Sequence, residues 1–304
     1  MPELPLVIST ELPLPLFIRG KVRDTYDLGQ HLLIIATDRI SAFDVVLPVG
    51  IPDKGRVLNQ LSAFWFERTK SIVPNHLTEV VDEVRTLGRY VPGTSQSTLP
   101  TYLAGRSMVV KKVQRLPVEC VVRGYLSGSA WAEYQQSGTV GGMKMPAGMK
   151  ESQLLPKPLF TPTTKADTGH DEPLTADGMK KLVGAKVAAE VEAKSLAVYA
   201  SAREYARGKG IIIADTKMEF GLDEGKVILI DELLTPDSSR FWDANQYRVG
   251  QSQPSYDKQP VRDWLVAAGW NKQPPAPMLP NEVIEATTRR YREAYERLTG
   301  RKLT

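Results

Sequence analysis

Residues 210–243, GIIIADTKMEFGLDEGKVILIDELLTPDSSRFWD, contain two apolar runs separated by a turn signal. The first run starts with β-branched residues at 211–213 and then alternates polar and apolar side chains. The second run, 227–230, is entirely apolar, and the Asp-Glu-Gly sequence between the runs is typical of a tight turn. The stretch therefore predicts a β-hairpin around which the rest of the chain is organised.

The polar residues of this hairpin predict a charged rim. Side chains two apart on a strand share a face, so Lys217 and Glu219 should point one way. Met218 and Phe220 should point into the core, and the fold-back should bring Glu219 near Asp231, within a residue or two of register. Neighbouring carboxylates repel each other unless a cation neutralises them, and Mg²⁺ typically binds one or two carboxylates together with substrate phosphates. The alternative is an ordinary exposed hairpin with solvated charges.

Composition favours a globular protein of one large or two ordinary domains, because the 304 residues are 42% hydrophobic and 24% charged. The single cysteine, Cys120, excludes an intramolecular disulfide framework, which fits a reducing compartment. The N-terminal stretch carries four prolines and no basic residue ahead of its apolar residues, so it resembles neither a signal peptide nor a membrane span. We therefore expect a cytoplasmic protein without a membrane partner.

The charge pattern leaves two partner classes to weigh. Net charge is +4, from 39 basic and 35 acidic residues, and a basic balance is compatible with nucleic-acid binding. However, the basic residues are dispersed, and pairs such as Lys111-Lys112 are the longest runs. A modest positive excess also steers anionic small molecules toward an enzyme. We favour that interpretation and expect no nucleic-acid partner.

Polar turns interrupt the apolar strands at several other places. Gly20, Lys21 and Arg23 lie at the bend of a predicted hairpin, where backbone N–H groups and cations can cover a triphosphate. No Walker A loop and no G-x-G-x-x-G after a strand is found, so the alternative is a surface hairpin. The 38–44 segment, DRISAFD, follows the predicted strand at 31–37, either as part of a ligand site or as a capped turn.

Further along, small residues surround Arg123 at 123–131, which lets a ligand approach closely, although a loosened loop is the alternative. The polar turn at 236–240 carries a guanidinium group suited to phosphate or carboxylate. Residues 138–175 form a long irregular stretch, and such stretches are usually functional or mobile. Leu116-Pro117 is a candidate crossing between lobes.

Helical spacing of apolar residues predicts helices at 56–69, 261–268 and 281–298. A longer helical segment covers 176–207, with Gly184 as a possible break. Asn281 and Gly300 are the expected N-cap and C-cap of the last helix.

Together these motifs closely resemble the SAICAR synthetase family, in its longer form. The matching segments are GKVRDTY at 20–26, ATDRISAFD at 36–44, VECVVRGYLSGSAWAEY at 118–134, FTPTTKAD with HDE at 160–172, IIIADTKMEFG at 211–221, IDELLTPDSSRFWD at 230–243 and SYDKQPVRDWL at 255–265. Met218 departs from the aromatic residue expected there, but it should face the core.

The resemblance implies an ATP-dependent ligase of purine biosynthesis. It would join L-aspartate to CAIR, a carboxylated aminoimidazole ribonucleotide, and form SAICAR, ADP and phosphate. A carboxylate is a poor acyl donor, so phosphorylation by ATP to an acyl phosphate fits the chemistry, with direct displacement as the alternative. A small-molecule kinase of similar architecture is the rival function, although H-R-D and D-F-G kinase motifs are absent.

Matching the motif positions implies roles for individual residues. The implied assignments are Lys217 and Asp215 at the reacting centre; Gly20, Lys21 and Arg23 on the ATP phosphates; Arg123, Ser129 and Arg240 on the ribonucleotide; Asp38, Ser41, Lys165, His170 and Asp171 on nucleotide or aspartate; and Glu219 and Asp231 on Mg²⁺. Adenine is expected near residues 110–119.

The expected fold is an α/β protein of the α+β type, a two-lobed ATP-binding ligase with antiparallel sheets, flanking helices and an active site in the cleft between the lobes. A β-rich lobe at 1–115 and a larger lobe at 116–304, holding the hairpin and the C-terminal helices, are the expected domains. We expect a monomer, with a homodimer as the alternative.

Overall fold

The computed structural model describes residues 5–91, 99–165 and 171–303. The chain divides into two compact units. Unit 1 comprises Met1–Phe64, His76–Lys112 and Tyr256–Thr304, and unit 2 comprises Trp65–Asn75 and Val113–Ser255. Both units combine antiparallel strands with helices, which confirms the predicted fold class.

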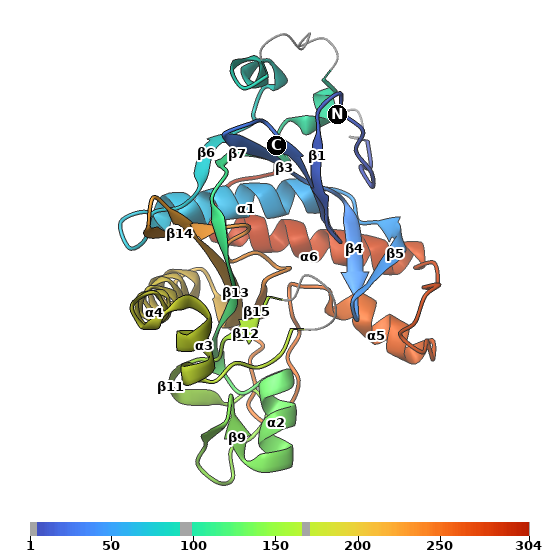
Figure 1. Ribbon diagram of the computed structural model, residues 1–304. Coiled ribbons are helices and arrows are strands. Elements are labelled where there is room, and N and C mark those ends of the chain that lie inside the picture. The colour runs from blue at the N-terminus through green and yellow to red at the C-terminus, as the bar shows by residue number, and fades with distance from the viewer. Residues whose placement is uncertain (1–4, 92–98, 166–170, 304) are drawn as a thin grey trace. The chain divides into compact units, whose positions relative to one another are not determined.

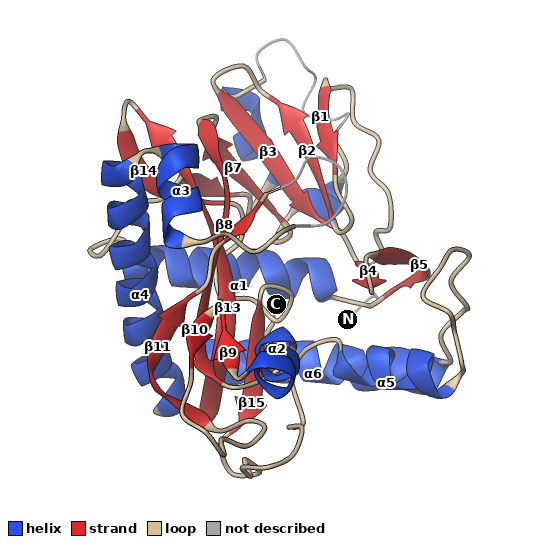
Figure 2. Cartoon of the chain, turned by 60° about the horizontal axis from the view of Figure 1, so that its bottom comes forward, coloured by secondary structure: helices blue, strands red, loops and turns tan. Residues whose placement is uncertain are grey.

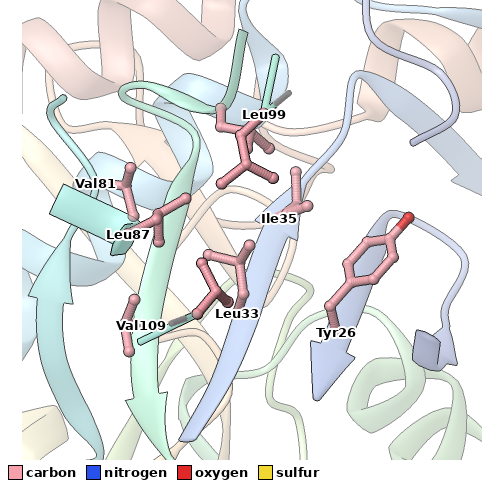
Figure 3. Packing of buried hydrophobic residues seen from close by; sticks show 9 residues of the cluster. Tyr26, Leu33, Ile35, Val81, Leu87, Leu99 and Val109 are labelled. Carbon is pink, nitrogen blue, oxygen red and sulfur yellow. The ribbon is translucent and has the colours of Figure 1, made fainter. Parts of the chain in front are cut away.

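Unit 1 is built on a five-stranded antiparallel sheet in the order β1-β2-β3-β7-β6 (Figure 1). The strands are β1 (Leu16–Arg19), β2 (Arg23–Asp27), β3 (His31–Ala36), β6 (Leu77–Val80) and β7 (Ser107–Lys111), and the unit also holds the 3-10 helices η1 (Val84–Arg89) and η3 (Thr101–Leu103). Apolar side chains of β2, β3 and β7 pack against those of the η1 region, as Figure 3 shows for Leu33, Ile35, Val109 and Leu87.

A second core of unit 1 explains where the C-terminal helices belong. The hairpin β4 (Arg39–Ala42) and β5 (Val45–Gly50) packs Ile40 and Leu47 with Val261 and Leu265 of α5 (Gln259–Ala267). The C-terminal helices α5 and α6 (Asn281–Thr299) therefore group with the N-terminal unit, whereas a division at residue 115 would have placed them in the other. Helix α1 (Lys54–Thr69) starts two residues before its predicted position.

Unit 2 is built on an antiparallel sheet with β8 and β13 at its centre. The strands are β8 (Gln114–Tyr125), β11 (Leu154–Phe160), β12 (Thr163–Thr164), β13 (Ile211–Asp223), β14 (Lys226–Ile230) and β15 (Ser239–Asp243). The order is β11-β8-β13-β14, with β12 also on β8 and β15 also on β13. Pro117 lies inside β8, so the predicted crossing at Leu116-Pro117 is wrong: the chain passes between units after Lys112.

The hairpin of β13 and β14 is confirmed, with Glu219 opposite Ile230 and Asp231 directly after it. Helix α4 (Ala185–Arg207) packs on this sheet, and α3 (Ala176–Val183) packs on α4 (Figure 2). Gly184, with φ of 85°, breaks the two helices as predicted. Met218 and Phe220 are fully buried, as predicted from the alternation along β13.

The remaining elements of unit 2 form a small subdomain with its own core. They are α2 (Ser129–Ser137), β9 (Thr139–Val140) and β10 (Met143–Lys144), and Leu126, Ala130, Val140 and Leu155 pack together there. In the last helix, Pro280 occupies the N-cap position, so the expected Asn281 cap is wrong by one residue. Gly300 is the left-handed C-cap, as predicted. Within the described residues, every helix is too short or too polar to cross a bilayer.

Candidate active site

One face of the unit 2 sheet carries the charged residues that the hairpin pattern predicted. Asp215, Lys217 and Glu219 are two residues apart on β13, so their side chains share a face. Across the ladder, Asp215 lies opposite Arg123 of β8, and Glu219 lies opposite Glu119. Antiparallel sheets commonly bury one face and expose the other, and here α4 packs on the sheet.

The arginine row consists of Arg123, Asp215 and Arg240. Arg240 on β15 is the direct neighbour of Asp215 in the ladder and bonds the same carboxylate oxygen that Arg123 Nη1 approaches at 3.5 Å. Arg123 also donates to Thr161 Oγ1 at 3.0 Å and to Ser129 Oγ at 3.1 Å, and its side chain is only 13% exposed. Burial lowers the pKa of the Arg123 guanidinium, the carboxylate of Asp215 raises it, and Arg240 lowers it further. The row holds two guanidinium groups and one carboxylate. It therefore carries an excess positive charge, which can attract an anion.

Two glycines make this row possible. Gly128, the residue before α2, has φ of 55°, and a Cβ added there would overlap the guanidinium group of Arg240. Gly124 on β8 faces α4, where Tyr199 occupies the space of its missing side chain. Tyr199 donates to the carbonyl of Ile213 at 2.7 Å, so it fastens α4 to β13 next to the row.

The lysine cluster consists of Glu119, Lys165, Lys217 and Glu219. Lys165 Nζ lies 2.9 Å from Glu119 Oε1 and 2.8 Å from Glu219 Oε1, and Lys217 Nζ lies 3.1 Å from each oxygen of Glu119. Burial would raise the pKa of Glu119, but the ammonium groups of Lys217 and Lys165 bring it below its ordinary value. Burial would lower the pKa of Lys165, but Glu219 and Glu119 raise it.

Glu119 was missed by the sequence analysis, although it occupies the centre of this cluster. It lies within the apolar run 118–122, where a single acidic residue is a visible exception. Lys165 was predicted to contact nucleotide or aspartate. In the structure its ammonium group bridges the carboxylates of Glu119 and Glu219. Its position follows from β12, whose Thr164 pairs with Val118 of β8.

The predicted metal ligands lie at neighbouring places in the hairpin. Glu219 is on β13, and Asp231, with φ of 66°, directly follows its ladder partner Ile230. Among the described residues, no group of three or more His, Cys, Asp or Glu side chains forms a self-sufficient metal site. A cation at Glu219 and Asp231 would therefore need further oxygen ligands from substrate, as Mg²⁺ commonly has.

The other predicted contacts come from segments outside these two groups. Asp171 is exposed on the segment before α3, and His170 lies outside the described residues. Ser41 is half-buried on β4, opposite Val46. The expected adenine contacts at residues 110–119 stay a prediction.

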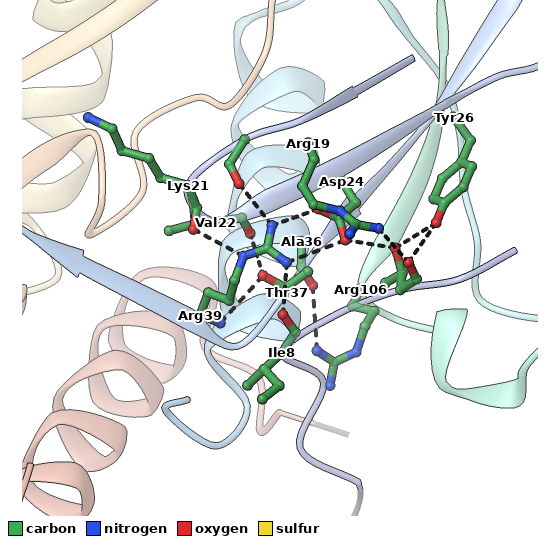
Figure 4. Close-up of polar contacts among 12 residues, drawn as sticks. Ile8, Arg19, Lys21, Val22, Asp24, Tyr26, Ala36, Thr37, Arg39 and Arg106 are labelled. Atoms are coloured by element: carbon green, nitrogen blue, oxygen red, sulfur yellow. Dashed lines mark hydrogen bonds and ion pairs between the residues drawn. The ribbon is translucent and has the colours of Figure 1, made fainter. Parts of the chain in front are cut away.

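Unit 1 contains the 20–23 turn, made of Gly20, Lys21, Val22 and Arg23, between β1 and β2. Lys21 Nζ lies 2.5 Å from Asp44 Oδ1, and both side chains are exposed. Gly20 N donates to the carbonyl of Arg23 at 2.8 Å, which closes the turn. The polar surroundings of this turn are drawn in Figure 4.

Asp38 has a scaffolding position in unit 1. Its side chain is 1% exposed, and its two oxygens accept from the backbone N–H groups of Val7 and Gly55 and pair with Arg106 Nη1 at 2.9 Å. A carboxylate with these partners holds the segment after β3 in place, and its expected ligand contact stays a prediction.

Comparison with known proteins gives one consistent result. The protein-family model described as SAICAR synthetase matches residues 16–277. A phosphoribosylaminoimidazole-succinocarboxamide synthase of Thermodesulfovibrio yellowstonii is 52% identical over 300 residues, which cover 97% of this chain and 99% of that protein. The corresponding synthase of Thioalkalivibrio sulfidiphilus is 54% identical over 299 residues, which cover 97% and 98%.

Solved structures agree with the sequence relatives. A SAICAR synthase from Saccharomyces cerevisiae, in complex with SAICAR, aligns with a TM-score of 0.88 and 46% identity, over 97% of this chain and 99% of that one. A type-2 SAICAR synthetase in complex with ADP aligns with a TM-score of 0.67 and 25% identity, over 94% and 98%. These likenesses do not favour the alternative of a small-molecule kinase.

Proposed function

Because this chain belongs to the SAICAR synthetase family, the ATP-dependent ligases of purine biosynthesis, we propose that the charged face of its unit 2 sheet joins CAIR to L-aspartate. Relatives of this chain have been solved with SAICAR and with ADP, which supports the choice of substrates. The observation that carries the proposal is the arginine row and the lysine cluster side by side on β8 and β13.

The arginine row would bind the anionic ribonucleotide. CAIR carries a phosphate and a carboxylate, and a guanidinium group recognises either with two parallel hydrogen bonds. Arg123 and Ser129 contact each other, and Arg240 is set against Gly128, which supports a binding geometry that forms before substrate arrives. Asp215 would hold both guanidinium groups in position instead of reacting itself, since it pairs with each of them.

The lysine cluster would serve the phosphoryl transfer. A carboxylate becomes a competent acyl donor when one of its oxygens attacks the γ-phosphorus of ATP, releasing ADP and leaving an acyl phosphate. The aspartate amine then attacks the acyl carbon, phosphate leaves with that oxygen, and the amine proton is lost. Lys217 is 49% exposed beside Glu119, so its ammonium group can move onto the transferring phosphoryl oxygens.

Two further groups would handle the ATP phosphates. Glu219 and Asp231 would hold Mg²⁺ at the hairpin, and the ion when bound would neutralise phosphate charge. The donor set fits, since both residues offer carboxylate oxygens and Asp231 directly follows Ile230, the ladder partner of Glu219. Gly20, Lys21 and Arg23 of the 20–23 turn would cover the phosphates with backbone N–H groups and cations.

An oxygen-isotope experiment tests this function. With CAIR labelled by ¹⁸O in its carboxylate, the released phosphate should carry one labelled oxygen, and the other product should be the amide SAICAR. Unlabelled phosphate together with amide formation would overturn the acyl phosphate. A stable phosphorylated product that forms with or without aspartate would indicate a kinase instead. Sedimentation of the purified chain would test the monomer that we propose.

A further inference from the structure

Arg39, the first residue of β4, is bonded through every donor of its guanidinium group. Nε donates to the carbonyl of Lys21 at 3.1 Å, and Nη2 donates to the carbonyl of Gly20 at 2.9 Å. The remaining three N–H groups go to the two carboxylate oxygens of Asp24, at 2.7 and 3.3 Å, and to the carbonyl of Ile8 at 2.9 Å (Figure 4). Five donors therefore meet five acceptors, which is the full capacity of an arginine side chain.

The contacts of Arg39 complete a pattern in the 20–23 turn. The carbonyls of Gly20 and Lys21 point to Arg39, and the carbonyl of Val22 accepts from both the backbone N–H and the hydroxyl of Thr37. The fourth carbonyl, of Arg23, accepts from Gly20 N. All four carbonyl oxygens of the turn are thus held by protein donors, whereas the N–H groups of Lys21 and Val22 take no part in these bonds.

Burial makes the arrangement rigid. Asp24 is fully buried, and the side chain of Arg39 is 12% exposed, so the ion pair lies in a low-dielectric setting where its geometry is enforced. Thr10 donates to Asp24 Oδ2 at 2.7 Å and exchanges a further bond with the hydroxyl of Tyr26. The guanidinium group is therefore anchored on the inner side of the turn by groups that reach it from three parts of unit 1.

We propose that Arg39 is a positioning residue for polyphosphate binding: it draws the carbonyl oxygens of Gly20 and Lys21 inward so that the N–H groups of the next residues, Lys21 and Val22, and the Lys21 side chain face the ligand. Carbonyl oxygens repel phosphate, so a turn free to rotate its peptide planes would present the wrong groups for part of the time. The inference rests on the proposed role of this turn in covering the ATP phosphates. Arg39 itself does not touch the ligand in this account.

Replacing Arg39 by lysine keeps the charge but not the shape of the donor set. An ammonium group offers three donors from a single atom and cannot span Gly20, Lys21 and Asp24 together. We expect Arg39→Lys to raise the Michaelis constant for ATP by roughly 10-fold, and Arg39→Gln by up to about 100-fold, as losing one or two charge-assisted hydrogen bonds implies. The constants for CAIR and aspartate should change by less than about 2-fold.

The experiment compares Arg39 with Arg19. Arg19 Nε also approaches Asp24, at 3.5 Å, but its other contact is the carbonyl of Thr10, so it does not touch the turn carbonyls. Arg19→Gln is therefore the matched control and should leave the ATP constant unchanged. The second readout is product inhibition: ADP should bind more weakly to the Arg39 variants, whereas AMP, which lacks the β-phosphate, should bind as it does to the unaltered enzyme.

Three outcomes would separate this inference from the proposed function. If Lys21→Met raises the ATP constant but the Arg39 variants do not, the positioning role fails and the role of the turn survives. If neither changes the constant, the turn does not bind phosphate, and both proposals about it fail. If the binding of ADP and of AMP weakens equally in the Arg39 variants, the substitution disturbs unit 1 as a whole and the positioning role fails. Should Arg39→Gln fail to fold because buried Asp24 loses the closer of its two arginine partners, Arg39→Lys still decides the question.

Discussion

The arginine row and the lysine cluster occupy the same face of one sheet but differ in charge and in freedom. The row has two guanidinium groups and one carboxylate, and Arg123 is fixed by Ser129 and Thr161. The cluster has two ammonium groups and two carboxylates, and Lys217 is half exposed on a flexible stem. A fixed positive excess suits recognition of an anion, whereas a balanced, adaptable group suits charge that moves during a reaction.

The largest effect should come from the adaptable member of the cluster. Lys217→Met removes the ammonium group proposed to move onto the transferring phosphoryl oxygens, and we expect kcat to fall by on the order of 10²–10³-fold. The Michaelis constant for CAIR should change little, because the arginine row is intact. Steady-state kinetics with each substrate varied measures both quantities.

Lys226→Met provides the matched control. Lys226 is an exposed lysine on β14 of the same hairpin, so its replacement removes the same charge from the same sheet without touching the cluster. Full activity is expected there. If Lys217→Met keeps kcat within 2-fold of the unaltered enzyme, phosphoryl transfer does not use this face of the cluster.

The second prediction concerns the fixed row. Arg123→Lys and Arg240→Lys keep the charge but lose the planar fork, and a lost charge-assisted hydrogen bond weakens binding by roughly 1.5–3 kcal/mol. The Michaelis constant for CAIR should therefore rise by about one to two decades. The constant for ATP should stay nearly unchanged. A rise in the ATP constant alone would mean that these arginines bind the nucleotide and that the two regions have exchanged roles.

The contrast between the regions was only partly readable from the sequence. Alternation along β13 predicted that Lys217 and Glu219 share a face and that Met218 and Phe220 are buried, since local period-2 patterning determines which face a side chain takes. It did not predict Glu119 as their partner, because the pairing joins β8 to β13 across about 100 residues of chain, and no local pattern reports such a register.

Asp38 is a second residue whose partner could not be predicted from local sequence. The sequence places it directly after an apolar strand, where ligand contacts are common, but its partner Arg106 lies 68 residues further on. Only the tertiary structure shows that the carboxylate is buried and paired with Arg106. The C-terminal helices likewise join unit 1 through a core with β4 and β5, an association that helical periodicity cannot indicate.

The third prediction tests whether the row's rigidity matters apart from its charge. A Cβ at Gly128 would overlap the guanidinium group of Arg240, so Gly128→Ala should shift that group and raise the CAIR constant several-fold without removing any charge. Gly225→Ala is the control: this glycine also has positive φ, 79°, but a Cβ there meets no neighbouring atom. Gly225→Ala should lose roughly 1 kcal/mol of unfolding free energy from its positive φ alone. Gly128→Ala should lose at least as much, because its φ of 55° and ψ of −130° are a conformation that side chains with a Cβ rarely adopt. Equal kinetics for the two variants would show that Arg240 adapts freely.

The smallest effect should appear in the pH dependence of the free energy of unfolding, and it should come from Glu119 of the lysine cluster. Burial opposes ionisation of Glu119, but Lys217 and Lys165 outweigh it, so the pKa of Glu119 in the folded chain lies below its ordinary value of 4.5. The folded state therefore binds the proton more weakly than the unfolded state does. The resulting stabilisation is fully present above about pH 4.5 and is lost as the pH falls through the lowered folded-state pKa.

Glu119→Gln removes this titration, so the difference in unfolding free energy between the two proteins should be constant from pH 7 to about pH 5. Below pH 4.5 the difference should shrink. The unaltered chain loses the stabilisation that ionised Glu119 provides, whereas the glutamine variant has no carboxylate there to titrate. Urea unfolding at half-unit pH steps measures the difference. A difference that stays constant through the acid range would mean that the two lysines do not hold Glu119 ionised, and that the cluster's balance of charge is not what keeps Lys217 in place.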